Sequence, residues 1–329
     1  MNLLMNLPWL KSYTQNLKKD NLHHSLIISG REGLGKNYLA EGLIQGILCT
    51  NSKDLEPCGR CQSCKLYESD NHPDFHKIDL EDGRKSISIN QIRAFYLEMF
   101  ESPFLGGNKI FFIPRSNLLS RESYDALLKT LEEPPKNTFI ILINSDSQNL
   151  SATILSRCHE INIKKPQDEE LKSWLEKQEV NIDSLDQLID LSKGKPLRAL
   201  ELEQTKSIEL RSEFIADISS LIKQGNNISE ITDKWIKNEE SLLLQIEWMS
   251  DLLMDILRMR FYVDEKSIFS DTANISTYME DKIEPIEVFK LLDKTINLWN
   301  KFYKNNNLRQ DYHLQSLLVD WNSAIGLRS

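Results

Sequence analysis

The sequence predicts an α/β domain built on a parallel sheet, followed by an all-α region. Short apolar runs with strand character alternate with segments of helical period up to about residue 165, which is typical of a parallel sheet. A glycine-rich turn joins the first of these strands directly to a helix. From about Pro166 onward the strand pattern disappears, and the apolar segments have helical period. The 329 residues are enough for about two domains, or three small ones.

The first region alternates between strands and helices. Apolar residues from Trp9 to Leu17 recur at helical spacing, so we expect a helix over residues 9–19. The expected strands are Ser25–Ser29, Phe75–Leu80, Lys109–Ile113, Phe139–Ile143 and His159–Ile163. The expected helices are Asn37–Leu48, Asn90–Met99, Glu122–Leu131, which Pro134 and Pro135 terminate, and a short one that ends near Ser156.

The second region contains helical patterns only. A polar stretch at Thr205–Ser207 is expected to be a linker. Beyond it, apolar residues step by four, three, four and three positions from Leu242 to Ile256, which predicts the core face of a long helix rather than a cofactor site. Other helical segments are expected at 171–175, at 185–191, after the turn at 194–196, around Pro285–Trp299 and at Arg309–Ile325.

The composition excludes several classes of protein. Apolar residues make up 40% and charged residues 27%, so the chain is neither disordered nor collagen-like. The net charge of −9 provides no overall positive field for nucleic acid, and any DNA contact must be local or shared with a partner. The densest apolar run, 139–143, is far shorter than the roughly 18 residues of a membrane helix. Because the N-terminus also lacks a signal-peptide pattern, we expect a cytoplasmic protein without membrane association.

Four of the five cysteines lie close together in the sequence. Cys49 is followed by eight residues, then by Cys58, Cys61 and Cys64 at intervals of two residues. Four thiolates suit one tetrahedral Zn²⁺ site, and a closed shell of protein ligands would make the metal structural. A disulfide pair and an iron–sulfur cluster are the alternatives. We expect His23, His24 and His72 to be hydrogen-bonded histidines rather than ligands, and the separate Cys158 to be a buried small residue.

The glycine-rich turn resembles a phosphate loop. Gly30, Gly33, Gly35 and Lys36 fit the pattern GxxxxGK, in which backbone N–H groups and the lysine bind phosphates. The next position should be Ser or Thr to hold Mg²⁺, but Asn37 occupies it. A chance glycine turn is the alternative. The sequence predicts a degenerate phosphate loop, leaves ATP binding open and predicts no Mg²⁺ site.

A working phosphate-loop ATPase also needs an acidic residue at the end of a second strand. The best candidate strand, Lys109–Ile113, continues into Pro114 and Arg115, and a guanidinium cannot bind Mg²⁺. The alternative strand ends at Asn144-Ser145-Asp146, where the single acid falls in a loop. We therefore expect an ATPase fold without ATPase chemistry.

Further motifs resemble the bacterial clamp-loader family of AAA+ proteins. These are the segment ALLKTLEEPP (126–135), the triplet Ser156-Arg157-Cys158 and the four-cysteine insertion behind the phosphate loop, and together with their surroundings they cover about residues 8–204. The resemblance implies a subunit of a five-membered ring, together with gamma/tau and delta subunits, that opens the sliding clamp and places it on primed DNA. It implies an AAA+ domain at 1–165 with its zinc module at 49–64, a helical lid domain at 166–204 and a helical collar for oligomerisation at 205–329.

The resemblance also assigns roles to single residues. In this family the arginine of the Ser-Arg-Cys motif reaches ATP held by the neighbouring subunit, which implies that Arg157 acts catalytically in trans. A surface arginine that caps a helix end is the alternative. The nucleotide-sensing arginine of the second domain is displaced, because Leu197 stands at its expected place and Arg198 beside it.

Asn37, Pro114 and Arg115 place the chain with the non-hydrolysing member of the family rather than with the gamma/tau motor subunit. The resemblance also implies that the chain belongs to the DNA polymerase III holoenzyme, which is a DNA-directed DNA polymerase. The chain itself should nevertheless neither hydrolyse ATP nor polymerise nucleotides. An active AAA+ ATPase of the gamma/tau type is the first alternative. A zinc-dependent DNA-binding adaptor is the second, and the net charge opposes it.

Overall fold

The computed structural model describes residues 7–15, 17–145, 152–178, 180–224, 227–262, 267–304 and 309–326. The chain divides into two compact units. Unit 1 comprises Met1–Glu179 and Gly194–Arg198, and unit 2 comprises Val180–Lys193 and Ala199–Ser329. The three-part division at residues 165 and 204 stays a prediction.

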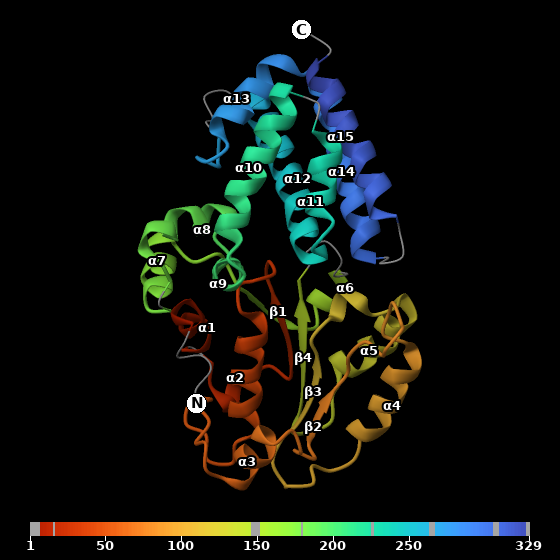
Figure 1. The fold of residues 1–329 in the computed structure, drawn as a ribbon. Helices are drawn as coiled ribbons and strands as arrows, with labels where there is room; N and C mark the ends of the chain where they lie inside the picture. Colours follow the sequence, from red (N-terminus) through yellow and green to blue (C-terminus); the bar gives the residue numbers. More distant parts are fainter. Residues whose placement is uncertain are drawn as a thin grey trace. The chain divides into compact units, whose positions relative to one another are not determined.

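Unit 1 is built on a five-stranded parallel sheet with the strand order β2-β3-β4-β1-β5 (Figure 1). Its strands are β1 (Ser25–Ser29), β2 (Phe75–Lys77), β3 (Lys109–Ile113), β4 (Thr138–Asn144) and β5 (His159–Asn162). Its helices are η2 (Pro8–Leu10), α1 (Lys11–Thr14), η3 (Lys19–Asn21), α2 (Lys36–Leu48), α3 (Gln62–Glu68), α4 (Ile89–Met99), η4 (Ser116–Leu118), α5 (Arg121–Glu132), α6 (Ala152–Leu155) and α7 (Asp168–Glu176). The predicted fold class, an AAA+-type parallel α/β domain with a cysteine insertion followed by helices, is confirmed.

The central strands of the sheet are covered on both faces. Residues of β1, β3 and β4 alternate between the two faces, and both sets are buried except for the partly exposed Phe139 of β4, because helices cover each side. Phe111 and Ile140 pack with apolar residues of α4 and α5 in one core. Figure 1 shows α2 on the other side of the sheet. The carboxyl end of β1 leads straight into the glycine turn and α2, which places the predicted phosphate loop at the edge of a rigid core.

Two predicted elements of unit 1 are shorter than expected. The helix expected at 9–19 is limited to η2 and α1, since the chain is extended at Lys18 and the ammonium of Lys19 donates to the carbonyl of Cys49. Strand β2 ends at Lys77 rather than Leu80, because the Asp79 side chain accepts the Leu80 N–H and turns the chain. In both places a tertiary or local polar contact overrides the apolar pattern.

Unit 2 is helical. Its elements are η5 (Ile182–Ser184), α8 (Leu185–Leu191), most of α9 (Pro196–Gln204), α10 (Ser207–Gln224), α11 (Ile228–Trp235), α12 (Glu239–Phe261), α13 (Ala273–Lys282), α14 (Pro285–Lys304) and α15 (Gln310–Gly326). The predicted stripe from Leu242 to Ile256 lies in the core of this unit, almost fully buried. That part of the prediction is confirmed. The expected linker at Thr205–Ser207 is a short break between α9 and α10 within unit 2, and Ser207 is already the first residue of α10.

A buried ion pair joins α10 to the segment before α13. The guanidinium of Arg211 donates from Nε and Nη2 to the Asp271 carboxylate, at 2.9 and 3.1 Å. It also lies over the rings of Phe214 and Trp248, each 5.2 Å from the ring centre. Because the side chain of Arg211 is almost fully buried, its charge depends on Asp271 and on these rings for compensation.

No helix within the described residues is both long enough and apolar enough to span a membrane.

We expect Asp271→Asn to lower the free energy of unfolding of unit 2 by about 3 to 5 kcal/mol, because it leaves a buried guanidinium without its counter-charge. Urea denaturation followed by tryptophan fluorescence measures the change. The control is Asp320→Asn, which removes the partner of Lys294 from an exposed pair and should cost less than about 1 kcal/mol. Equal losses in the two variants would contradict the role given to the Arg211 pair.

Candidate functional site

The glycines of the predicted phosphate loop lie where side chains would collide with the fold. Gly30 has a φ of +138°, and a Cβ atom there would approach the carbonyl oxygen of Ile163 to 2.5 Å. Gly35 has a φ of +92°, and a Cβ atom there would lie 2.9 Å from Cδ1 of Leu7. The turn lies between a strand and a helix, as a phosphate loop does. Residues from other parts of the protein pack directly against Gly30 and Gly35.

Lys36 is directed onto the carbonyl groups of its own loop. Only 6% of Lys36 is exposed, and its ammonium donates to the carbonyl oxygens of Gly30 and Arg31, at 2.9 and 2.8 Å. Burial lowers the pKa of Lys36 to about 8, while the nearby Glu32 acts in the opposite direction. The ammonium that would contact phosphates is therefore engaged with the protein backbone.

Two other segments hold the backbone of this loop. The indole N–H of Trp9 donates to the carbonyl of Leu34 at 2.9 Å, and the N–H of Leu197 donates to the carbonyl of Gly33 at 3.1 Å. Both contacts lie within unit 1. The loop is thus fixed by the N-terminal segment on one side and by the first residues of α9 on the other.

The end of β3 has a basic residue where an acidic one would be needed. Arg115 donates from Nε to the Asp79 carboxylate at 2.7 Å. Partial burial works to raise the pKa of Asp79, but the hydrogen bond from Arg115 and the N–H of Leu80 hold it below its ordinary value. This nearby carboxylate is therefore committed to the guanidinium. Asp146, the acid considered after β4, lies outside the described residues.

Arg157 is bound within unit 1 in two ways. Its guanidinium forms an ion pair with Glu132, the first glutamate of the LEEPP segment. Its Nη1 also donates to the carbonyl of Thr153 at 2.8 Å, at the end of the short helix α6. These contacts match the alternative of an arginine that caps a helix end. They also bring the two family motifs into contact, and the side chain keeps 29% of its surface exposed.

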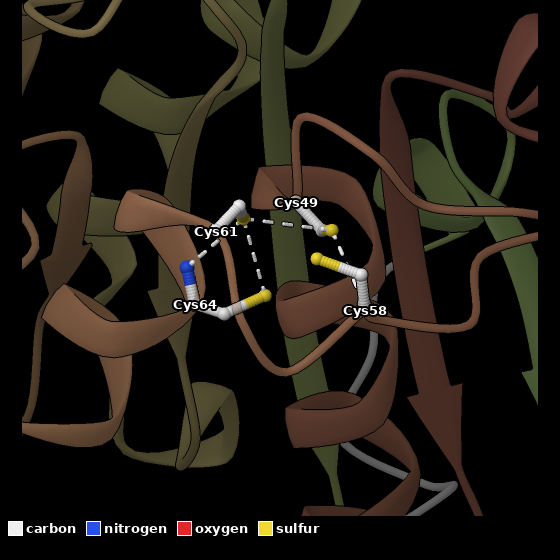
Figure 2. A group of neighbouring side chains, drawn as sticks. All are labelled: Cys49, Cys58, Cys61 and Cys64. Atoms are coloured by element: carbon white, nitrogen blue, oxygen red, sulfur yellow. Dashed lines mark hydrogen bonds between the residues drawn. The ribbon is translucent and has the colours of Figure 1, made fainter.

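The four clustered cysteines converge on one point, as Figure 2 shows. All their sulfur atoms lie within 4.8 Å of one another. Cys49 caps the end of α2, Cys61 caps the start of α3, and Cys64 lies in its first turn. Cys58 enters from the loop between these helices. The sequence prediction that these four residues form one cluster is confirmed.

The geometry of the cluster fits a tetrahedral metal ion. A zinc ion with Zn–S bonds of ~2.3 Å requires sulfur atoms ~3.8 Å apart. The sulfur of Cys61 lies 3.8 Å from that of Cys49 and 3.4 Å from that of Cys64. The N–H groups of Cys58 and Cys64 donate to the sulfurs of Cys49 and Cys61, at 3.3 and 3.4 Å. The four cysteines could therefore hold a metal such as zinc, with N–H groups to stabilise the thiolates.

The thiols differ in acidity. Burial raises the pKa of Cys49 and of Cys64. Burial acts in the same sense on Cys61, but hydrogen bonds, led by the Cys64 N–H, lower its pKa to about 5. Backbone N–H groups also lower the pKa of Cys58. The pKa is thus lowered for two thiols of the cluster and raised for the other two, and a bound cation would favour the thiolate form of all four.

Sequence reasoning missed the residues that support this cluster. A Cβ atom at Gly46 would meet the carbonyl oxygen of Leu55 at 2.0 Å, so this glycine lets the cysteine loop lie against α2. The buried Ser63 hydroxyl donates to the carbonyl of Leu48 at 2.8 Å and lies 2.7 Å from Nε2 of His72. A glycine inside a helix was the available signal for Gly46. Nothing in the sequence pattern marks Ser63.

The three histidines and the fifth cysteine that we expected not to bind metal make contacts outside the cysteine cluster. His23 is hydrogen-bonded to Ser25, and His24 to the carbonyl of Leu131. His72 is buried and belongs to the support of the cysteine cluster rather than to its ligands. Cys158 packs against the core, and burial raises its pKa to about 12. These residues lie outside the four-cysteine cluster, and Cys158, expected to be buried, is only partly buried.

Comparisons with known proteins identify the family. A family model described as "DNA polymerase III, delta subunit" matches residues 6–167, and one described as "DNA polymerase III, delta subunit, C terminal" matches residues 205–323. The chain is 36% identical over 155 residues to DNA polymerase III subunit tau/gamma of Haemophilus influenzae, a match that covers 47% of this chain and 22% of that protein.

Matches to DNA polymerase III subunit delta' extend much further along the chain. The protein of Pseudomonas aeruginosa is 29% identical over 97% of this chain and 98% of its own length. The protein of Haemophilus influenzae is 30% identical over 80% of this chain and 81% of its own length. The predicted family is confirmed, and so is the preference for a member other than the gamma/tau subunit. This chain belongs to the family of DNA polymerase III delta' subunits.

Proposed function

We propose that this protein is a non-hydrolysing stator of the DNA polymerase III clamp loader, a cytoplasmic ring of five subunits that includes gamma/tau and delta subunits. In this role it helps to load the sliding clamp on primed DNA without using ATP itself. The observation that supports this proposal most directly is the state of Lys36, whose ammonium donates to two carbonyls of its own loop.

Nucleotide binding at this loop would have to compete with those contacts. Hydrogen bonds to a charged group contribute about 1.5 to 3 kcal/mol each, and Lys36 would give up two of them to reach a phosphate. Asn37 offers no hydroxyl for Mg²⁺, and Arg115 adds positive charge instead of a metal ligand. The loop residues Gly30, Gly33, Gly35, Lys36 and Asn37 therefore act in our proposal as structural parts of the fold.

We further propose that Arg157 acts in trans on ATP held by a neighbouring motor subunit. The pair with Glu132 is partly exposed, and such pairs contribute only about 0 to 1 kcal/mol. A γ phosphate carries more negative charge than one carboxylate, so the guanidinium can exchange Glu132 for phosphate at little cost. The same contacts keep Arg157 near the surface before the ring assembles.

The helical part is proposed to supply the ring contacts, with a lid at 166–204 and a collar at 205–329. Within unit 2, α14 exposes Phe289, Ile296 and Tyr303, which recur every seven residues and so lie along one face of the helix. Large apolar side chains along one exposed helix face are typical of helix-to-helix interfaces. In the proposed ring this face packs against a neighbouring subunit.

The cysteine cluster is proposed to hold one structural zinc ion. Four protein ligands leave no open position for water or substrate, so such an ion can stabilise the fold but cannot catalyse a reaction. Its role is to hold the end of α2, the start of α3 and the intervening loop together.

The non-hydrolysing role predicts how the isolated chain behaves toward ATP. The isolated chain should not hydrolyse ATP, and any ATP binding should be weak and nearly independent of Mg²⁺, because both metal-binding positions are lost. Calorimetry with and without Mg²⁺, together with a phosphate-release assay, measures both properties. Turnover that disappears in Lys36→Ala would identify a motor subunit instead and overturn the proposal.

The proposed action of Arg157 in trans predicts the effect of removing its guanidinium. In the reconstituted clamp loader, Arg157→Ala should leave assembly intact and slow hydrolysis at the one ATP site that receives this residue, by roughly 10³ to 10⁵-fold if it acts as a full arginine finger. Single-turnover hydrolysis and clamp loading on primed DNA measure the effect.

Glu132→Gln separates this function from a structural role. It breaks the ion pair but keeps the guanidinium, so hydrolysis should stay at the level of the unmodified complex or rise. If Glu132→Gln and Arg157→Ala slow hydrolysis equally, the ion pair rather than the arginine is what matters, and the role in trans is refuted.

The proposed zinc site predicts the metal content of the protein and of its cysteine variants. The purified protein should contain about one zinc ion per chain, and Cys61→Ser should lose most of it, since one thiolate ligand is removed. Elemental analysis measures the content. Cys158→Ser, which changes a cysteine outside the cluster, should keep its zinc. Four freely titrating thiols in a zinc-free native protein would show that the cluster is not a metal site.

A further inference from the structure

A buried hydroxyl joins the two helix ends that carry cysteines. Ser63 precedes Cys64 in α3, and its Oγ lies 2.8 Å from the carbonyl oxygen of Leu48, the residue before Cys49. Both the serine and that carbonyl therefore sit one residue away from a proposed zinc ligand. The only hydrogen on Oγ is donated to Leu48, so Oγ can accept a second hydrogen bond.

His72 supplies that second hydrogen bond, and its protonation follows from its partners. Nδ1 accepts the N–H of Asp74 at 3.1 Å, which places the single ring proton on Nε2. Nε2 lies 2.7 Å from Oγ of Ser63 and donates to it. Burial lowers the pKa of His72, although Asp74 acts in the opposite direction, so the neutral ring is favoured. Each donor in the series of hydrogen bonds from Asp74 through His72 and Ser63 to Leu48 then has one acceptor.

The same series of hydrogen bonds continues from Asp74 to an exposed loop. The Asp74 carboxylate is 1% exposed and accepts the N–H groups of Phe104 and Leu105, at 2.6 and 3.0 Å. A second link runs parallel to it, from the side-chain amide of Asn108 to the carbonyl of Ile47 in the last turn of α2, at 3.0 Å. Phe104 itself is 82% exposed. The loop 103–108 is thus held at Phe104 and Leu105 by Asp74, which His72 contacts, and at Asn108 by the last turn of α2.

We propose that His72 is a positioning residue that couples the four-cysteine module to the loop 103–108. One nitrogen of its ring orients Ser63 and so the two cysteine-bearing helix ends, and the other orients Asp74 and so the loop. This inference rests on the proposed zinc site. Loss of metal should reach Phe104 and Leu105 through His72, while the rest of the sheet stays intact.

Two substitutions separate the two sides of the ring. His72→Asn can keep an acceptor near the position of Nδ1 but has no donor at that of Nε2. His72→Gln reaches the position of Nε2 with an amide donor but loses the acceptor. We expect the asparagine variant to bind zinc about 10 to 100-fold more weakly, as is typical for the loss of such a support, and to keep the loop amides protected. The glutamine variant should bind zinc nearly as the unmodified protein does.

The readouts are zinc affinity, by competition with a chromophoric chelator, and hydrogen exchange at the amides of Phe104 and Leu105. In the glutamine variant these two amides should exchange about tenfold faster or more, because the N–H of Asp74 has lost its acceptor, although the Asp74 carbonyl still accepts the N–H of Ile110. Chelator-treated protein should show the same acceleration, while amides of the central strand β4 stay protected. His313→Gln, a histidine of unit 2, is the matched control and should change neither readout.

The outcomes distinguish the inference from the proposal beneath it. An unmodified protein that binds zinc, with both His72 variants equal to it in affinity and exchange, would overturn the coupling and leave the zinc site standing. An unmodified protein without zinc would overturn both. If either variant fails to fold, Ser63→Ala provides the second test: it should weaken zinc binding, and unchanged affinity would again refute the coupling.

Discussion

The burial of α2 along one face of the sheet is the constraint on which both candidate sites depend. Its N-terminus carries Lys36 directly after the glycine turn, and its C-terminus is capped by Cys49. The 13-residue helix packs through Leu39, Leu43 and Ile47, which are fully buried, so neither end can move without disrupting the core. The phosphate loop and the cysteine module are therefore opposite ends of one rigid element.

This arrangement gives the glycines of the predicted phosphate loop a structural role that does not depend on metal or nucleotide binding. Gly30 and Gly35 are needed because the backbone of Ile163 and the side chain of Leu7 lie too close for any Cβ atom. The buried ammonium of Lys36 finds its hydrogen-bond acceptors in the carbonyls of Gly30 and Arg31, within the turn itself. Packing and backbone hydrogen bonds are therefore sufficient to explain residues that bind phosphate in an active ATPase. Their presence is therefore weak support for nucleotide binding.

Much of the fold and part of the candidate site could be predicted from the sequence. Strands β1 and β3 lie where their apolar runs indicate, because such runs are short, bounded by turns and buried on both faces. The cysteine cluster was predictable for a different reason, since metal ligands are residues of fixed type at short spacing. Both signals are local and need no knowledge of distant contacts.

The rest of the site depends on contacts between residues far apart in sequence. The direction of the Lys36 side chain, the pairing of Arg157 with Glu132 and the approach of Leu55 to Gly46 leave no periodic signal. The premature end of α1 has the same origin, because Lys19 reaches the carbonyl of Cys49 thirty positions away. Such polar contacts become visible only when the fold brings their partners together.

The two ends of α2 also differ in how they can change. At the phosphate loop the buried ammonium of Lys36 is already satisfied, so substitution of the metal ligands around it removes chemistry and leaves the packing intact. At the cysteine module, loss of a single cysteine would remove one of the four ligands by which the proposed zinc ion joins the end of α2, the start of α3 and the loop between them. The proposed stator can therefore lose ATP chemistry without losing its shape, whereas its cysteines cannot be replaced one at a time at comparable cost.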